Sequence, residues 1–122
     1  MAKLKMWFGI VLILAVGLIH VIEAPDSFQE AAYKGWLFYA NGLAALVAAF
    51  GIYRRDCRGW HLGFLVAAGS LAVYIASRTV GLPLLPAEPD AWLEPLGLAS
   101  MITEGLFVLL YLIPGQSGHC GK

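Results

Sequence analysis

The sequence predicts an all-α fold, a bundle of four transmembrane helices in up-down-up-down order that forms a single domain over residues 1–122. The first observation is composition: 60% of the residues are hydrophobic and 13% are charged, whereas soluble domains hold about a quarter charged residues. A chain this short has little interior in which to keep so much apolar surface from water. The second is the occurrence of four apolar runs close to the ~17–25 residues that cross a bilayer. They cover residues 6–22, 35–53, 60–77 and 96–113.

The first span, residues 6–22, also has the outline of a cleaved signal peptide. Lys3 and Lys5 precede the apolar stretch, and Glu23-Ala24 follows it. However, Ile22 is not the small residue expected two positions before Ala24, and Pro25 would follow the cut. These departures favour a retained membrane helix.

The other three spans are separated from it and from one another by polar or proline-rich connectors at residues 23–34, 54–59 and 78–95. A soluble helix shows a polar face about once per turn, and residues 6–18 and 43–53 show none. This periodicity favours a membrane bundle over a soluble one. Short connectors join antiparallel neighbours, which predicts the up-down order.

Charge predicts the orientation of the spans. Basic residues gather in the two termini and in the second connector: Lys3, Lys5, Arg54, Arg55, Arg58 and Lys122. The first and third connectors hold mainly acids: Glu23, Asp26, Glu30, Glu88, Asp90 and Glu94. Since Lys and Arg are enriched on the cytoplasmic side, we expect both termini in the cytoplasm of a bacterium, with the chain in the inner (plasma) membrane.

Aromatic and small residues mark span ends and packing faces. Each of the four tryptophans lies at or beside a predicted span end, as interfacial anchors do: Trp7, Trp36, Trp60 and Trp92. Small residues recur four apart, as in Gly63 and Ala67, a spacing that lets membrane helices approach closely.

Polar residues inside the spans are costly, and they are therefore the first candidates for function. Glu104 lies eight residues into the fourth span, roughly 12 Å below its outer edge, and must face the bundle interior. Ser100 lies one turn outward on the same face. Ser70, Tyr74 and Arg78 share one face of the third span because they are four apart.

The remaining intramembrane polar residues complete a predicted pocket in the outer half of the bundle. Its members are His20, Glu23, Asn41, Ser70, Tyr74, Arg78, Ser100 and Glu104. Glu104, Ser70 and Asn41 would form the floor, and the others line the wall or rim. The alternative is a network that only sets helix register, with Glu104 paired to Arg78 or hydrogen-bonded to Tyr74 and Asn41.

A divalent metal is the candidate cofactor of this pocket. His20-x-x-Glu23 places an imidazole and a carboxylate one turn apart, and Glu104 could add a third ligand. A bis-histidine haem is disfavoured because His61, the other histidine in a span, lies at the opposite face.

A second set of possible ligands lies on the predicted cytoplasmic side. Cys57, His61, His119 and Cys120 could bind zinc in principle, but we expect both cysteines to be reduced thiols there.

No sequence motif indicates a particular reaction. The chain shows no nucleophile–base pair, phosphate loop or cofactor motif, and no basic stripe that would suggest nucleic acid. We therefore expect a small integral membrane subunit or binding module in the lipid bilayer, acting in a homo-oligomer or larger membrane complex. The alternative is a metal- or proton-dependent transporter or a membrane redox protein that uses the same pocket.

One stretch carries a resemblance. The run Arg78-Thr79-Val80-Gly81-Leu82-Pro83, followed by Glu94-Pro95-Leu96-Gly97 and Glu104, is similar to a pattern in small four-helix bacterial membrane proteins. The resemblance covers about the C-terminal half of the chain and implies a topology without an activity.

Overall fold

The computed structural model describes residues 2–83, 85–88, 92 and 94–113, and these form four α-helices. The helices are α1 (Ala2–Glu30), α2 (Ala32–Tyr53), α3 (Cys57–Thr79) and α4 (Pro95–Leu112). All four are long and apolar enough to cross a membrane. The predicted all-α class and the four spans are thereby confirmed, while the identity of the membrane stays a prediction.

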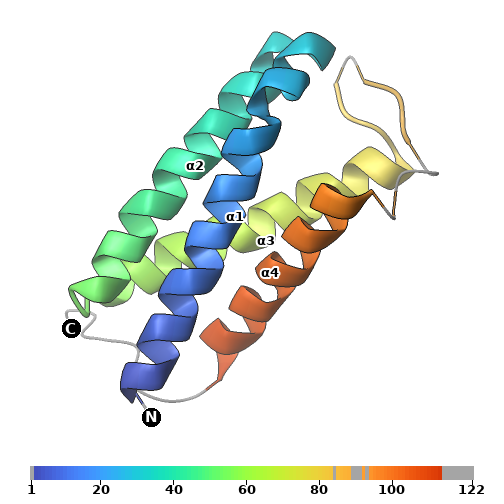
Figure 1. Cartoon of the computed structure of the whole chain (residues 1–122). Helices are drawn as coiled ribbons and strands as arrows, with labels where there is room; N and C mark the ends of the chain where they lie inside the picture. Colours follow the sequence, from blue (N-terminus) through green and yellow to red (C-terminus); the bar gives the residue numbers. More distant parts are fainter. Residues whose placement is uncertain (1, 84, 89–91, 93, 114–122) are drawn as a thin grey trace.

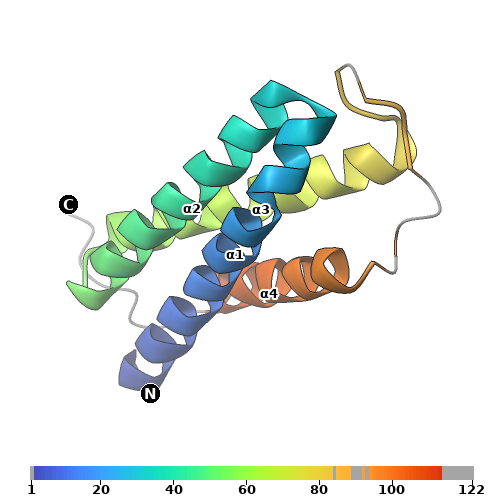
Figure 2. The ribbon, with the colours of Figure 1, turned by 45° about the horizontal axis from the view of Figure 1, so that its top comes forward.

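The helices pack as a ring in chain order. α1 contacts α2 and α4, and α3 contacts the same two helices. α1 and α3 also touch across the ring, whereas the described residues of α2 and α4 make no contact. Figures 1 and 2 show α1 and α2 side by side, with α3 and α4 inclined to them. α4 therefore has α1 and α3 as its neighbours and lies across the ring from α2.

Polar and aromatic contacts fix which segments share an end of the bundle. Lys5 Nζ donates to the carbonyl of Ile113 over 2.9 Å, and the Trp7 and Tyr53 rings lie 6.1 Å apart. The start of α1, the α2–α3 turn and the end of α4 thus form one end, which we call the basic end after Lys3, Lys5, Arg54, Arg55 and Arg58.

The opposite end carries the acids. Tyr33 donates its hydroxyl hydrogen to the Pro83 carbonyl over 2.6 Å, which joins the α1–α2 turn to the α3–α4 loop. We call this the acidic end after Glu23, Asp26, Glu30, Glu88 and Glu94. The side of the membrane on which each end lies stays a prediction.

The first connector differs from the prediction, because residues 23–34 are helical apart from Ala31. α1 continues through Pro25 to Glu30, and Ala31 alone is extended (φ −165°, ψ 137°) before α2 begins. Ala24 and Ser27 are buried, and the Phe28 ring lies 5.3 Å from that of Trp36. This burial holds two further turns of α1, whose 29 residues span roughly 44 Å against a ~30 Å hydrocarbon core.

The second connector is a tight turn. Arg55 adopts a positive φ of 60°, and Asp56 caps α3 by accepting a hydrogen bond from the Arg58 backbone N–H over 3.0 Å. The Arg58 guanidinium also binds this carboxylate, and these hydrogen bonds lower the pKa of Asp56 to about 2. Gly51 and Gly59 let the two backbones meet, since a Cβ on Gly51 would lie 2.8 Å from the Gly59 Cα.

The apolar core lies in the half of the bundle nearer the basic end. Its buried members are Ile10, Ile13, Val16, Ala45, Ala48, Ala49, Ile52, Trp60, Ala67 and Phe107. Trp60 is only 2% exposed and stacks on Phe107 with ring centroids 5.4 Å apart. The prediction that Trp60 is an interfacial anchor was therefore wrong, because the ring points inward between helices. Trp7 and Trp36 are 47% and 67% exposed, as anchors would be.

Candidate functional site

A buried carboxyl lies halfway along α4. Glu104 is the tenth of the 18 residues in α4 and is 1% exposed. Ser100, one turn earlier, donates its hydroxyl hydrogen to Glu104 Oε2 over 2.6 Å. The helix itself thus supplies one partner for this carboxyl, as the i, i+4 spacing allows.

The second partner comes from α1. His20 Nε2 lies 3.7 Å from Glu104 Oε2, and the imidazole is 12% exposed. His20 Nδ1 lies 2.8 Å from the carbonyl oxygen of Val16. A carbonyl only accepts, so the hydrogen is placed on Nδ1 and Nε2 is left to face the carboxyl. The Phe38 ring of α2 covers His20, with centroids 5.0 Å apart.

One oxygen of the carboxyl is not used by these partners. Glu104 Oε1 is buried and has no hydrogen-bond partner among the described residues. Burying an unpaired carboxyl oxygen costs free energy, and the cost is larger within a membrane. Glu104 Oε1 is therefore an unpaired, buried acceptor in the middle of the bundle.

The predicted floor of the pocket is divided into two clusters. Asn41 Nδ2 donates to Ser70 Oγ over 2.6 Å, which joins α2 to α3. The described residues show no hydrogen bond or ion pair between these two side chains and Glu104, whose partners lie on α1 and α4. The division agrees with the ring, in which the described residues of α2 and α4 are not neighbours.

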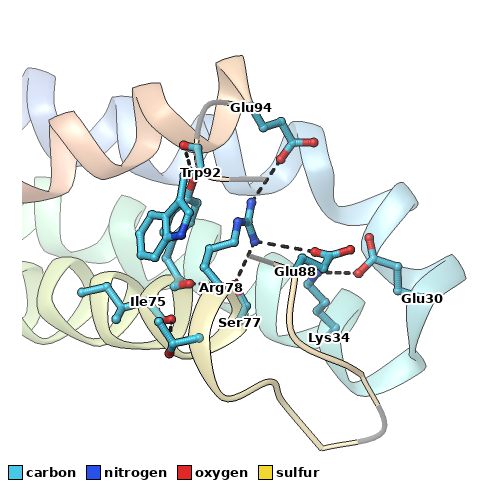
Figure 3. Close-up of polar contacts among 10 residues, drawn as sticks. Glu30, Lys34, Ile75, Ser77, Arg78, Glu88, Trp92 and Glu94 are labelled. Atoms are coloured by element: carbon cyan, nitrogen blue, oxygen red, sulfur yellow. Dashed lines mark hydrogen bonds and ion pairs between the residues drawn. The ribbon is translucent and has the colours of Figure 1, made fainter. Parts of the chain in front are cut away.

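Arg78 belongs to the acidic end. It is 7% exposed and donates to Ser77 Oγ over 2.8 Å. Figure 3 shows its guanidinium between Glu94, at 3.4 Å, and Glu88, at 3.7 Å. The same group lies 4.3 Å from the centroid of the Tyr74 ring. Arg78 thus ties the α3–α4 loop to the end of α3, and Glu104 pairs with His20 instead.

Tyr74 also ties the α3–α4 loop to α3. Its hydroxyl donates to the Trp92 carbonyl over 3.1 Å, and the two rings meet edge to face with centroids 5.8 Å apart. Gly97 leaves the space that the Tyr74 ring occupies, since a Cβ there would lie 2.9 Å from it. Tyr74 and Arg78 therefore serve the loop over the bundle rather than the buried pair.

Glu23 interacts electrostatically both with the charged residues of the acidic end and with the buried Glu104. Its carboxylate interacts at longer range with Glu94 and Arg78 at the acidic end and with Glu104 in the bundle. It makes no hydrogen bond or ion pair with the described residues.

The candidate metal site gains no support from this geometry. In the described part of the chain no three His, Cys, Asp or Glu side chains come together as metal ligands. His20 and Glu104 approach each other, but Glu23 does not complete a set with them.

The second possible set of metal ligands, at the basic end, also gains no support from the structure. Cys57 is 3% exposed and is disulfide-bonded, so the expectation of a reduced thiol was wrong. His61 Nδ1 lies 2.8 Å from the Tyr111 hydroxyl. His119 and Cys120 lie outside the described residues.

Two partners of the site residues were missed by sequence reasoning. Phe38 carries no polar signal, and only packing of α2 on α1 brings its ring onto His20. Glu88 is ten residues from Arg78 in a proline-rich loop, so its contact depends on how that loop turns back. The excess of acids in the loop was the one available signal.

Known proteins offer no template for this site. No protein family model, curated protein or solved structure matches the chain. Function is therefore argued from the geometry of the chain itself.

Proposed function

We propose that this protein is a small integral membrane binding module whose binding centre is the His20–Glu104 pair, and that it acts within a homo-oligomer or larger membrane complex. The supporting observation is the buried Glu104 carboxyl in the middle of a span. One of its oxygens contacts Ser100 and faces His20, and the other is unused by the described residues.

The unused oxygen favours binding over a purely structural role. A carboxyl that only sets helix register gains most when both oxygens accept hydrogen bonds, because each unpaired buried oxygen is costly. Asn41 and Ser70 supply a register contact between α2 and α3, and there too Asn41 Oδ1 is buried without a hydrogen-bond partner among the described residues. Of these two unpaired oxygens, the one on Glu104 belongs to an ionisable group, so it can take up a proton or accept a charge-assisted hydrogen bond from a cation.

The chemistry of the pair selects a class of ligand. A carboxyl oxygen accepts hydrogen bonds, so the ligand would be a proton or a small group with an N–H or O–H donor, such as a primary ammonium. The acidic end favours the approach of cations, since clustered carboxylates concentrate positive ions locally. Glu23 extends this negative potential from the acidic end towards Glu104.

Proton-dependent transport is the second candidate, and the His20 geometry supports it. With Nδ1 donating to Val16, a single proton can reside on Nε2 or on Glu104 Oε2, 3.7 Å away. Such a pair can take up and release a proton inside the membrane. The metal-dependent and redox alternatives have no comparable ligand set in the described residues.

The test compares Glu104→Gln and Glu104→Leu with the matched control Glu88→Gln, which removes an exposed carboxylate at the acidic end. Each protein is purified in mild detergent, and its thermal stability and native mass are measured with ammonium, methylammonium and choline. We expect at least one of these cations to stabilise the wild type and Glu88→Gln, but neither Glu104 variant. Wild-type cation response and assembly in both Glu104 variants would refute the proposal.

A further inference from the structure

The outer faces of α1 and α2 form an apolar groove at the basic end. Its volume is about 590 Å³, within the range of ligand pockets. Its lining is wholly apolar or aromatic: Trp7, Ile10, Leu14, Leu46, Val47, Ala49, Phe50 and Tyr53. Ile10 and Ala49 form the buried floor, at 8% and 6% exposure, and the other six side chains are exposed and form open walls. The groove exists partly because Ala49 is short.

The groove has the length and depth of part of a lipid chain. Trp7 to Leu14 on α1 and Leu46 to Tyr53 on α2 each cover seven residue steps, roughly 10 Å, or about a third of the hydrocarbon core. Trp7 and Tyr53 pair at one end, edge to face at 6.1 Å. Aromatic pairs of this kind lie at the headgroup level, so the groove runs from that level into the membrane.

Positive charge lies where a headgroup would be. Arg54 follows Tyr53, and its guanidinium lies 5.6 Å from the centroid of the Phe50 ring, which is one wall of the groove. Arg54 is exposed and has no ion pair among the described residues. The nearby carboxylate of Asp56 is already bound by Arg58 over 2.7 Å. The cation at the mouth of the groove is therefore available to an anion.

We propose that this groove binds one acyl chain of an anionic phospholipid, with the lipid phosphate on Arg54. The occupant must be apolar over about 10 Å and must carry negative charge at the Tyr53 end, and an anionic lipid satisfies both conditions. A second copy of the chain fits less well. A two-fold parallel contact through this face would place Arg54 and Arg55 opposite their own copies, and like charges there repel.

The test measures lipid binding to the detergent-purified chain by native mass spectrometry. The probes are dioleoyl phosphatidylglycerol, dioleoyl phosphatidylcholine and inorganic phosphate. We expect the wild type to prefer the phosphatidylglycerol, and Arg54→Gln to lose about five-fold of that preference, the effect of one basic residue at an anionic surface. The matched control is Lys34→Gln, which removes a cation at the acidic end and should keep the preference.

The apolar half of the site is tested by filling it. Ala49→Leu occupies the floor, and Val47→Trp, on an exposed wall, serves if the first variant does not fold. Either should weaken binding of the phosphatidylglycerol, whereas Leu65→Trp on the exposed face of α3 should not.

Three results would overturn the inference. The first is equal binding of both lipids by the wild type. The second is displacement of the phosphatidylglycerol by inorganic phosphate alone, which would assign the site to a free anion. The third is a dimer that Val47→Trp abolishes, which would assign the groove to a second copy.

Discussion

Gly59→Ala should disrupt the contact between α2 and α3 because Gly59 packs directly against backbone. A Cβ at Gly59 would lie 2.5 Å from Ile52 N, 2.6 Å from Gly51 C and 2.8 Å from Ala48 O. Ordinary contact begins at 3.4 Å, so the helices would have to separate by most of an ångström. Backbone atoms cannot rotate away as a flexible side chain can. Gly69, on the same helix, has nothing within 4 Å of its Cβ position and is the matched control.

The magnitude follows from two opposing effects. Overpacking a well-packed contact costs about 1–3 kcal/mol, and we take the upper value because the clash is with backbone. Replacing glycine by alanine in a helix returns up to ~1 kcal/mol. We therefore expect Gly59→Ala to lower the free energy of unfolding by about 2 kcal/mol. Gly69→Ala, which meets no atom, should raise it by about 0.5–1 kcal/mol.

Unfolding by SDS in mixed micelles measures both variants. The signal is tryptophan fluorescence, to which the buried Trp60 of α3 contributes because its ring stacks on Phe107 of α4. A Gly59→Ala protein as stable as Gly69→Ala would refute the reasoning, because it would mean that α2 and α3 do not approach as closely as the structure shows.

Three further predictions concern the ends of the bundle. Asp56→Ala should lower the free energy of unfolding at neutral pH because it removes the cap of α3. The carboxylate contributes fully above its ordinary pKa of 3.8, and the contribution is lost as the pH falls through about 2. The stabilities of the two proteins should therefore converge in acid, and a pH-independent difference would contradict the assignment. Arg78→Gln should speed hydrogen exchange of the Glu88 amide, which donates to the Ser77 carbonyl over 2.9 Å. The reason is that the α3–α4 loop loses its ion pairs with the Arg78 guanidinium. Unchanged exchange would mean that Arg78 does not hold the loop. If charge orients the chain, the C-terminus is cytoplasmic, so a fluorescent protein fused after Lys122 should fluoresce in bacteria and an alkaline phosphatase fused there should be inactive. The opposite result would place this end outside the cytoplasm. That location would agree with the disulfide at Cys57, which an oxidising compartment favours.

Composition and the length of the apolar runs were sufficient to predict the class of protein and the number of spans. Apolar runs of membrane length leave few alternatives, since backbone groups in lipid must be satisfied within helices. The sequence also placed Glu104 in the interior, because a carboxyl facing lipid at that depth is costly. Its pairing with Ser100 follows from spacing along one helix. These conclusions need only composition, length and helical period.

Tertiary structure alone decided which helix faces meet. Glu104 pairs with His20 rather than with Arg78 because α1 lies against α4, while Arg78 stands at the far end of α3 beside Glu88 and Glu94. Asn41 stays apart from Glu104 because α2 and α4 are diagonal in the ring. Contacts of this kind depend on helix order and on close approach, and no period along a single helix encodes either.

The same reason accounts for the extension of α1 and the burial of Trp60. Polar residues such as Glu23 and Asp26 predicted a connector. However, Ala24 and Ser27 are buried, and their packing extends α1 as far as Glu30. Trp60 turned inward because Gly9 on α1 leaves space for its ring, which then stacks on Phe107. In both places the residue type allowed two outcomes, and the neighbouring helix selected one.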